Sequence, residues 1–583
     1  MATNDELAKI FGEMAEILEI TGANRFRVNA HARVARVLKD MTIDVASLVD
    51  DPKALTEIDG IGDASAKKII EYVRTGKVKE HQQLLKEIPA GLLDVLKIPG
   101  LGPKTVKLLW EQADVTSITT LKKAIDSGDL EDLPRMGAKT IQNIKDSIAF
   151  VAKSSRRVRL GQALPVAEAI VELLRDVSGT KQVQYAGSLR RGLETIGDID
   201  ILATTTKPAE LAEAFRTMED VSKVLAAGET KSSIRLKTGM QVDLRIVDDA
   251  VFGAALAYFT GSKQHNVVMR ERAIKKKLRL NEYGLFPDDG IDEPPQKRGI
   301  RPVAAKTEES IFKRLGLPWI PPEIREDRGE FNISKDSPPA LIELADIKAE
   351  LHTHTTDSDG HMTIDQLGEA AKTWGFHTVA VTDHSKSSAQ ANGLSEDRLR
   401  AQIDAVHEAN ERVKGITILA GSEVDILSDG RLDYDDDLLA ELDIVIASPH
   451  VALRQPTEKC TARLLQAIRH PLVHILGHPT GRMINAREGL HPDINALVEA
   501  AAEYNTALEL NANFYRLDLR DIHVKAAVDA GALVSINTDA HATDQFDQMR
   551  LGVLTARRGW LTANSCINTW TRQKLLKWLN AKK

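Results

Sequence analysis

Three aspartates in two apolar segments have the spacing of a metal-assisted phosphoryl-transfer site. Asp198 and Asp200 are separated by one residue in a segment that reads as a strand, so both carboxylates should point to the same face. Asp243 lies in a second strand-like segment, residues 241–247. Three convergent carboxylates repel one another unless cations lie between them, and two divalent ions about 3.5–4 Å apart can activate an attacking oxygen and stabilise the leaving one. An Asp-x-Asp pair also occurs at solvated strand edges, so the flanking residues must show whether this pair is catalytic.

The residues before this pair favour catalysis. The turn Gly187-Ser188 offers backbone donors, and Arg190 and Arg191 add positive charge suited to a triphosphate. Residues 187–202 resemble the palm motif of the nucleotidyltransferase superfamily. The motif therefore predicts transfer of a nucleotide.

A later segment narrows the resemblance. Tyr258-Phe259-Thr260-Gly261-Ser262, followed by Asn266 and Arg270, is similar to the nucleotide-selecting segment of family X DNA polymerases, the family of DNA polymerase beta. The resemblance implies that Tyr258 and Phe259 wall the sugar pocket against a ribose 2′-hydroxyl, and that Asn266 and Arg270 reach the nascent base pair and the template. The nucleotide-binding residues that it implies are Gly187, Ser188, Arg191, Tyr258, Phe259, Gly261, Ser262, Asn266 and Arg270.

The resemblance also implies roles for the acids. Asp198 and Asp200 would hold two Mg²⁺ or Mn²⁺ ions, and Asp243, the third acidic ligand, would help to deprotonate or orient the primer 3′-hydroxyl. Ser188 with Arg191 would hold the outgoing phosphates. Gln241 replaces the arginine usual beside the third acid, a departure that removes no metal ligand.

The N-terminal 150 residues read as helical and contain a partial repeat. Gly60-Ile61-Gly62 recurs as Gly100-Leu101-Gly102, and residues 133–139 form a degenerate third copy. Each is a tight turn leading into a helix N-terminus, where backbone N–H groups can bind a phosphate. The pattern resembles the helix-hairpin-helix motif. One such turn is often a plain connector, but spaced copies beside a palm predict DNA-backbone binding by Gly60, Gly62, Gly100, Gly102 and Lys104.

In DNA polymerase beta the first helical domain is also a lyase, and the resemblance places Lys68 at the position of its Schiff-base nucleophile. Arg27 and His31 fall where that family has a 5′-phosphate pocket. Thr56 and Ala64 replace two lysines of the family pattern, so the sequence leaves lyase activity open.

After residue 340 the chain changes character. Apolar runs alternate with helical periods, and six of the runs end in a His, Asp or Glu. Such ligands at strand C-termini are typical of a (β/α) barrel active site, and a His and carboxylate set without cysteine suits Zn²⁺, Mn²⁺ or Fe²⁺. The set resembles the polymerase-and-histidinol-phosphatase (PHP) domain, a distorted seven-stranded barrel that holds three metal ions. The ligands that this resemblance implies are His352, His354, Asp359, His384, Glu423, His450, His478, Asp539 and His541.

Together these segments predict a multidomain chain. Its parts are a lyase-like all-α helix-hairpin-helix domain at 1–90, a fingers-like helix-hairpin-helix domain at 91–150, an α/β nucleotidyltransferase palm at 151–260, a thumb at 261–316, a Pro-rich linker at 317–340 and a distorted (β/α)7 PHP barrel at 341–583.

Composition agrees with an intracellular DNA enzyme. The net charge is −7, but residues 1–340 carry 52 basic and 50 acidic residues (+2) and residues 341–583 carry 25 and 34 (−9), so the acidity lies in the barrel. Two cysteines fit a reducing compartment. With no leader and no apolar run of 18 residues, we expect a cytoplasmic protein that binds no membrane. The family resemblance implies gapped or nicked DNA and deoxynucleoside triphosphates as partners, and we expect a monomer.

The function that we predict is DNA-directed DNA synthesis across short gaps in repair. The barrel would add a metal-dependent 3′–5′ exonuclease, abasic-site endonuclease or 3′-phosphatase activity. Two alternatives stay open: a DNA-binding PHP phosphoesterase with an inactive palm, or a polymerase with a purely structural barrel.

Overall fold

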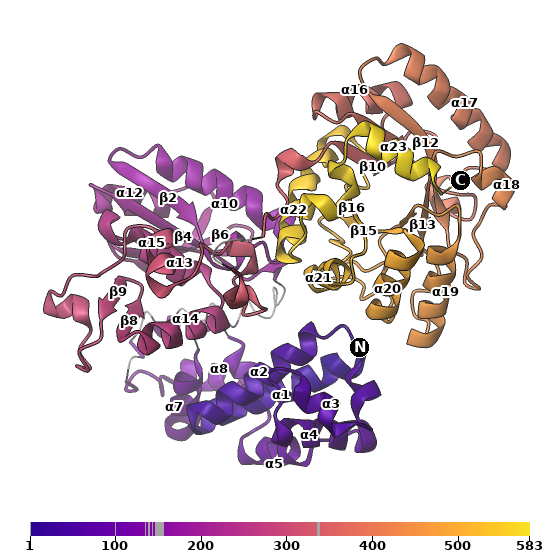
Figure 1. Ribbon diagram of the computed structural model, residues 1–583. Coiled ribbons are helices and arrows are strands. Elements are labelled where there is room, and N and C mark those ends of the chain that lie inside the picture. Colours follow the sequence, from indigo (N-terminus) through magenta and orange to yellow (C-terminus); the bar gives the residue numbers. More distant parts are fainter. Residues whose placement is uncertain are drawn as a thin grey trace. The chain divides into compact units, whose positions relative to one another are not determined.

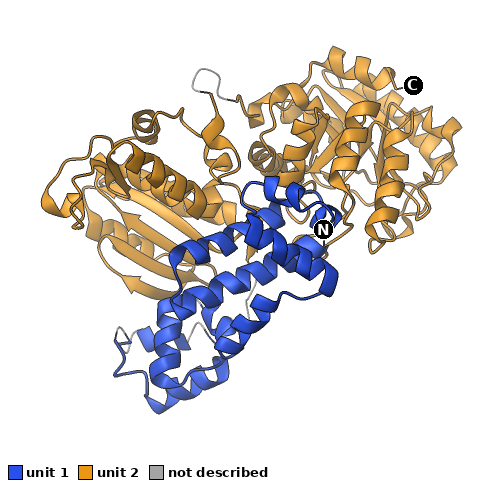
Figure 2. Cartoon of the chain, turned by 60° about the horizontal axis from the view of Figure 1, so that its bottom comes forward, with its two compact units in different colours: residues 1–156 blue, residues 157–583 orange. Residues whose placement is uncertain are grey.

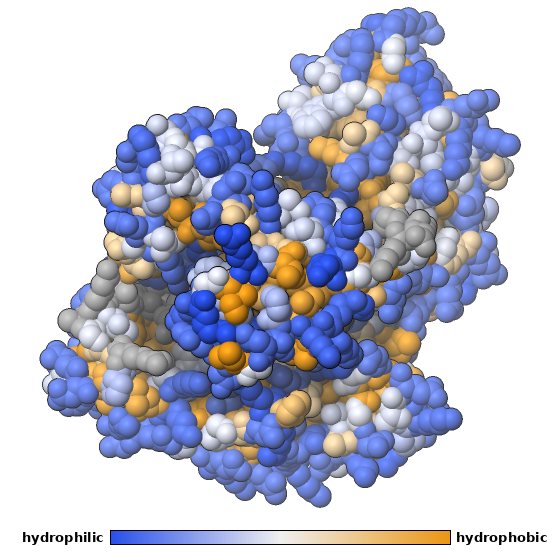
Figure 3. Space-filling view, turned by 60° about the vertical axis from the view of Figure 1, so that its left-hand side comes forward, coloured by the Kyte–Doolittle hydropathy of each residue, from blue (hydrophilic) through white to orange (hydrophobic). Residues whose placement is uncertain are grey.

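The computed structural model describes residues 2–98, 101–134, 136–137, 140–142, 144–145, 148, 157–334 and 339–582. They belong to two compact units, residues 1–156 and 157–583, coloured blue and orange in Figure 2. Each unit has its own buried core and is described by itself. Among the described helices, none combines the length and the apolar character needed to cross a membrane. The face shown in Figure 3 is mostly hydrophilic, with apolar side chains in scattered patches.

In the residues that the structure describes, the regular elements of the first unit are all helices, as predicted (Figure 1). Its elements are α1 (Ala2–Thr21), α2 (Arg25–Asp40), η1 (Val45–Leu48), α3 (Pro52–Glu57), α4 (Asp63–Thr75), α5 (Lys79–Glu87), α6 (Leu92–Leu96), α7 (Pro103–Ala113) and α8 (Ile118–Ser127). Buried side chains from Leu7 to Ile148 form one cluster. The two helical domains predicted with a boundary at residue 90 therefore share a core.

Two predicted glycine turns introduce helices of this unit. Gly62 caps α4 and Gly102 caps α7, with nearly equal φ values of −89° and −90°. Gly60 has φ +99°, and a Cβ there would lie 2.9 Å from Arg33 Nε. Only glycine fits this turn without strain. Gly100 and three of the seven residues of the third copy, Arg135, Ala138 and Lys139, lie outside the described residues.

The second unit begins with the palm. A five-stranded sheet has the order β2-β4-β7-β6-β5. Its strands are β2 (Thr180–Tyr185), β4 (Asp198–Thr205), β5 (Val221–Ala227), β6 (Lys231–Leu236) and β7 (Gln241–Ile246). The short strands β1 (Val158–Arg159) and β3 (Thr195–Ile196) form a separate two-stranded sheet. Its helices are α10 (Leu160–Arg175), α11 (Gly187–Arg190) and α12 (Pro208–Arg216).

Alternation along β4 gives the sheet two different faces. Ile199 and Ile201 pack with the buried side chains of α10 and α12. Leu202 packs on the other face with Phe252 of α13 (Phe252–Thr260). Because side chains alternate, Asp198 and Asp200 lie on this second face.

The thumb follows with helices and a small hairpin. Its elements are α13, η2 (Asp249–Val251), α14 (Lys263–Lys275), β8 (Leu278–Asn281), β9 (Gly284–Pro287), η3 (Pro295–Arg298) and α15 (Glu308–Leu315). Residues 317–334, assigned to a linker from their prolines, differ from that prediction. Leu317, Ile320 and Ile324 are buried with Ile311 of α15, and Arg325 is fully buried. The apolar side chains between the prolines are taken up by the thumb core, which the proline count alone does not reveal.

The rest of the second unit is a barrel of seven parallel strands in the order β10 to β16. The strands are β10 (Ala349–Thr353), β11 (Thr378–Val381), β12 (Thr417–Asp425), β13 (Ile444–Ser448), β14 (Ile475–Leu476), β15 (Ala507–Asn511) and β16 (Val534–Asn537). The helices are α16 (Ile364–Thr373), α17 (Glu396–Arg412), α18 (Asp436–Leu439), α19 (Thr457–Arg469), α20 (Ile494–Tyr504), α21 (Asp521–Asp529), α22 (Met549–Arg558) and α23 (Arg572–Asn580).

The first and last strands meet at the end of the barrel that carries the predicted ligands. His354 N donates to Ala540 O at 2.9 Å. The opposite end is filled by Trp570 and by Trp578 of α23, which pack against inward residues such as Leu351. The predicted distorted (β/α)7 barrel is confirmed.

Candidate functional site

The palm brings the three predicted acids together. β4 and β7 run parallel with Asp200 directly opposite Asp243. Desolvation, and then the charges of Asp198 and Asp243, raise the pKa of Asp200 to about 7. Such mutual repulsion is relieved by divalent cations, so the donor set fits the predicted pair of ions. Gln241 Nε2 donates to Asp243 Oδ1 at 3.1 Å and so orients that carboxylate.

A tight turn packs directly on these acids. Gly187 begins α11 with φ +61°, and a Cβ there would lie 2.5 Å from Asp200 Oδ2. Ser188 follows, half-buried, in the same short helix. The backbone thus approaches the carboxylates more closely than a side chain at this position would allow.

The two arginines of the motif are paired with carboxylates. Arg190 forms two hydrogen bonds of 2.8 and 2.9 Å with Glu308. Arg191 Nε donates to Glu326 Oε1 at 2.8 Å, and its Nη1 donates to Thr260 O at 2.7 Å. Arg191, predicted to hold outgoing phosphates, is therefore held by the thumb in this structure.

The nucleotide-selecting segment forms the end of α13 and the start of α14. The Tyr258 and Phe259 rings meet edge to face with centroids 5.2 Å apart. Asn266 Nδ2 donates to the backbone oxygens of Tyr258 and Gly261, at 2.8 and 3.1 Å. Ser262 Oγ accepts from the backbone N–H of His265 and so caps α14. The predicted residues lie together, and two of their side chains hold the turn in shape.

Farther along α14, the remaining predicted residue, Arg270, is half-buried. The Arg245 guanidinium lies 4.5 Å from the Phe259 ring centroid, a contact that the sequence did not reveal.

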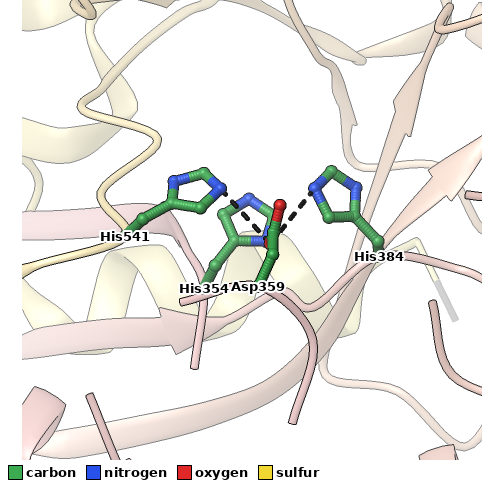
Figure 4. Close-up of side chains that lie close together, drawn as sticks. All are labelled: His354, Asp359, His384 and His541. Carbon is green, nitrogen blue, oxygen red and sulfur yellow. Dashed lines mark ion pairs between the residues drawn. The ribbon is translucent and has the colours of Figure 1, made fainter. Parts of the chain in front are cut away.

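The barrel brings all nine predicted metal ligands to the C-terminal ends of its strands. Three groups have ligand atoms close enough to share an ion: His354, Asp359, His384 and His541; His352, His354 and Asp539; and His384, Glu423 and His450. Figure 4 shows the first group, in which Asp359 Oδ1 lies 3.3 Å from His541 Nε2 and 3.6 Å from His384 Nε2. His354 and His384 each belong to two groups, so the three groups adjoin.

Glu423 lies at the centre of this cluster. Its carboxylate is 2.8 Å from His478 Nε2, 2.9 Å from His384 Nδ1 and 3.3 Å from His450 Nε2. Burial raises the pKa of Glu423, but His450, His352 and His384 outweigh it and hold the pKa well below its usual range.

Several buried donor atoms of the cluster lack hydrogen bonds. Within the described ranges, both ring nitrogens of His354, Nε2 of His352 and Oε2 of Glu423 make no hydrogen bond of good geometry. Opposite charges nevertheless lie close by, with His354 Nε2 3.0 Å from Asp539 Oδ1 and His384 Nδ1 2.9 Å from Glu423 Oε2. Buried polar atoms are normally satisfied, and unmatched imidazole and carboxylate atoms that converge are suited to metal ions. The residues present therefore fit the metal centre that the sequence predicts.

Comparison with known proteins identifies several domains of the chain. Family models match for the DNA polymerase beta thumb at residues 255–326, a helix-hairpin-helix domain at 2–78, a SAM-like helix-hairpin-helix tandem at 92–149 and the PHP domain at 350–513. The chain is 38% identical over 571 residues to the DNA polymerase/3′-5′ exonuclease PolX of Bacillus subtilis (strain 168), covering 97% of both chains. The chain belongs to the family X DNA polymerases that carry a PHP domain.

Other relatives of this family X chain match its barrel alone. A probable phosphatase of Tolumonas auensis is 33% identical, over 33% of this chain and 78% of that protein. A probable phosphatase of Thermoanaerobacter sp. (strain X514) is 28% identical, over 38% of this chain and 89% of that protein. The barrel therefore resembles proteins that consist mostly of a PHP domain.

Two carboxylates of the family X barrel were missed in the sequence. Glu509 on β15 accepts from His352 Nδ1 at 2.7 Å and from the backbone N–H of His478 at 2.7 Å. Asp425 accepts from His450 Nδ1. Such partners fix the tautomer and orientation of a ligating histidine. Glu509 lies inside an apolar run, residues 507–510. An acid within such a run is the sequence feature that could have predicted a functional carboxylate here.

An arginine beside the barrel cluster was missed as well. Arg516 Nε lies 3.7 Å from Asp539 Oδ2, and the Arg516 side chain is 18% exposed. It adds positive charge beside the cluster, and a guanidinium is suited to binding a phosphate.

In the helical unit, Lys68 is already paired. Its Nζ lies 2.9 Å from Glu80 Oε2, while Arg27 Nη2 lies 2.7 Å and His31 Nε2 3.9 Å from Glu80 Oε1. The three predicted lyase-site residues thus converge on one carboxylate. Lys104 is exposed in the first turn of α7, where a DNA phosphate could reach it.

Proposed function

We propose that this chain is a DNA polymerase with a hydrolytic second site, as the name of its Bacillus subtilis relative suggests. The pairing of Asp200 with Asp243, with Asp198 on the same face, carries the polymerase part. Bound Mg²⁺ or Mn²⁺ ions would activate the primer 3′-hydroxyl and stabilise the pyrophosphate that leaves. Asp198 and Asp200 would hold both ions.

Other palm residues would direct the proton, the leaving pyrophosphate and the sugar. Asp243, oriented by Gln241, takes up or directs the proton of the 3′-hydroxyl as its oxygen bonds to the α-phosphorus. The α–β phosphoric anhydride bond breaks, and Ser188 with Arg191 hold the outgoing pyrophosphate. Tyr258 and the adjacent ring wall the sugar pocket.

In the barrel, we infer hydrolysis of a DNA 3′ end. The oxygen of a water bonds to the phosphorus of the last phosphodiester, and the bond from that phosphorus to the 3′-oxygen of the penultimate nucleotide breaks. The freed 3′-oxygen takes up a proton, and a nucleoside 5′-monophosphate is released. Bound Mn²⁺, Zn²⁺ or Fe²⁺ ions would lower the pKa of that water and polarise the phosphate. Glu509 and Asp425 would orient His352 and His450 as ligands, and Arg516 would attract the phosphate.

A second candidate for the barrel is a 3′-phosphatase. The relatives that match the barrel alone are named probable phosphatases. Both reactions hydrolyse a phosphate ester, and they differ in the group attached to the terminal phosphate. An abasic-site endonuclease would use the same ligands.

The helical unit would bind the DNA backbone through its glycine turns, which suits a short gap in base excision repair or end joining. Lyase activity by Lys68 would require the pair with Glu80 to open. A cytoplasmic location and a monomeric state stay predictions.

A primer-extension assay tests the polymerase part. The chain is incubated with Mn²⁺ and a 5′-labelled primer that borders a short gap, with and without deoxynucleotides, beside an Asp198→Ala/Asp200→Ala variant. We expect the primer to be extended by the natural protein alone. Extension by the variant at the same rate would show that the acids do not form the synthetic site.

Primers with different 3′ ends test the barrel. A 3′-phosphate primer and a 3′-hydroxyl primer, both without deoxynucleotides, separate phosphatase from exonuclease. Shortening of the 3′-hydroxyl primer supports the exonuclease, whereas loss of phosphate without shortening supports the phosphatase.

A further inference from the structure

The end of barrel helix α22 contacts the palm turn that carries Arg191. Arg558 Nη1 donates to the backbone oxygen of Arg191 at 2.9 Å and to Glu326 Oε1 at 3.0 Å. The same guanidinium bonds Asp521 through Nε at 3.0 Å and Nη2 at 2.8 Å. The Arg558 side chain is only 6% exposed. This guanidinium is therefore fixed between the barrel, the thumb and the palm.

Glu326 is held by arginines from both sides of this contact. Arg191 Nε donates to the same Oε1 atom at 2.8 Å. The side chains of Arg191 and Glu326 are 11% and 14% exposed. Burial raises the pKa of Glu326, but Arg558, Arg191 and Arg328 outweigh it and lower the pKa, which keeps the carboxylate charged.

This sharing matters because Arg191 has two possible partners. The guanidinium that is proposed to hold the outgoing phosphates is engaged here by Glu326 and by Thr260 O. Turning to a triphosphate requires it to leave a mostly buried carboxylate. A buried charge that loses its partner is costly, and the donation from Arg558 to the same oxygen offsets that loss.

We propose that Arg558, a barrel residue, is a positioning residue for nucleotide binding in the palm. It keeps Glu326 paired while Arg191 turns toward the triphosphate. The inference rests on the proposed phosphate-binding role of Arg191. It gives the barrel a part in DNA synthesis that is separate from its own hydrolytic site.

Steady-state primer extension with Arg558→Met tests this positioning role, which we call the Arg558 relay. Without Arg558, Glu326 binds Arg191 more strongly, so the KM for the deoxynucleotide should rise about tenfold, equivalent to about 1.4 kcal/mol. The kcat should stay within about twofold. Adding Glu326→Gln should return KM close to the value of the natural protein, because a neutral amide competes weakly for the guanidinium. General damage to the domain contact would not be repaired by removing a second charge.

Arg557→Met is the matched control. Arg557 is the preceding residue, 11% exposed, and pairs with Glu323 and Glu343 rather than with Glu326. Its KM should be unchanged.

Arg191→Ala distinguishes failure of the positioning role of Arg558 from failure of the phosphate-binding role of Arg191. A raised KM in Arg191→Ala with an unchanged KM in Arg558→Met overturns the relay alone, as does a raised KM that Glu326→Gln fails to restore. An unchanged KM in Arg191→Ala overturns the phosphate-binding role and the relay with it.

Discussion

Replacing Gly187 by alanine should stop DNA synthesis without disturbing the barrel. The added Cβ would lie 2.5 Å from Asp200 Oδ2, and ordinary contact begins near 3.4 Å, so the oxygen must move by 3.4 − 2.5 = 0.9 Å. A displacement of about 1 Å in a catalytic group can lower the rate roughly 100-fold. The backbone, at φ +61°, adds a cost of about 1–2 kcal/mol for any residue with a Cβ.

The assay is single-nucleotide incorporation at saturating deoxynucleotide and Mn²⁺. We expect incorporation to fall about 100-fold, while shortening of a single-stranded primer continues at the natural rate. Gly375→Ala is the control, because Gly375 has φ +84° but no atom within 4 Å of the added Cβ. It adds the backbone cost without displacing an acid. Incorporation by Gly187→Ala within threefold of the natural rate would refute the close packing of this turn on Asp200.

Other substitutions probe the remaining parts. Glu509→Gln should weaken metal binding by the barrel about 10- to 100-fold, as measured by metal titration; unchanged affinity would exclude an orienting role. Arg516→Met should raise the KM of the exonuclease for a DNA end severalfold with extension intact, and equal KM values would remove it from substrate binding. Burial raises the pKa of Glu308, but Arg325 and Arg190 outweigh it and lower the pKa from 4.5 to about 2. Because the folded pKa is lower, this stabilisation is full above pH 4.5, about 3 kcal/mol at most, and is lost as the pH falls toward 2. Between pH 6 and pH 3, the free energy of unfolding, measured by chemical denaturation, should therefore fall less in Glu308→Gln than in the natural chain. An equal fall in the two proteins would contradict the pairing of Glu308 with Arg325 and Arg190.

The ligand positions could be predicted because the chemistry constrains them locally. Asp198 and Asp200 alternate on one strand, and the strand period alone places both on one face. In the barrel, the predicted ligands at six of the seven strands fall at the same end, because parallel strands share a direction. Residue type and position along the strand predicted which side chains lie together, whereas their roles as ligands came from the family resemblance and stay predictions.

The partners of those ligands were harder to predict. Arg191 pairs with Glu326, which is 135 residues away along the chain, and His352 pairs with Glu509, 157 residues away. No local period relates such positions. The segment 317–334 was misassigned because proline content indicates an extended chain but does not show that the intervening apolar residues are buried.

We propose that synthesis and hydrolysis take place at separate metal centres of one chain. The most direct test compares Asp198→Ala/Asp200→Ala with His384→Ala on one gapped, 5′-labelled primer, with and without deoxynucleotides. The account predicts that the palm variant loses extension and keeps shortening, while His384→Ala loses shortening and keeps extension. Loss of both activities in either variant, in protein that remains folded, would contradict it.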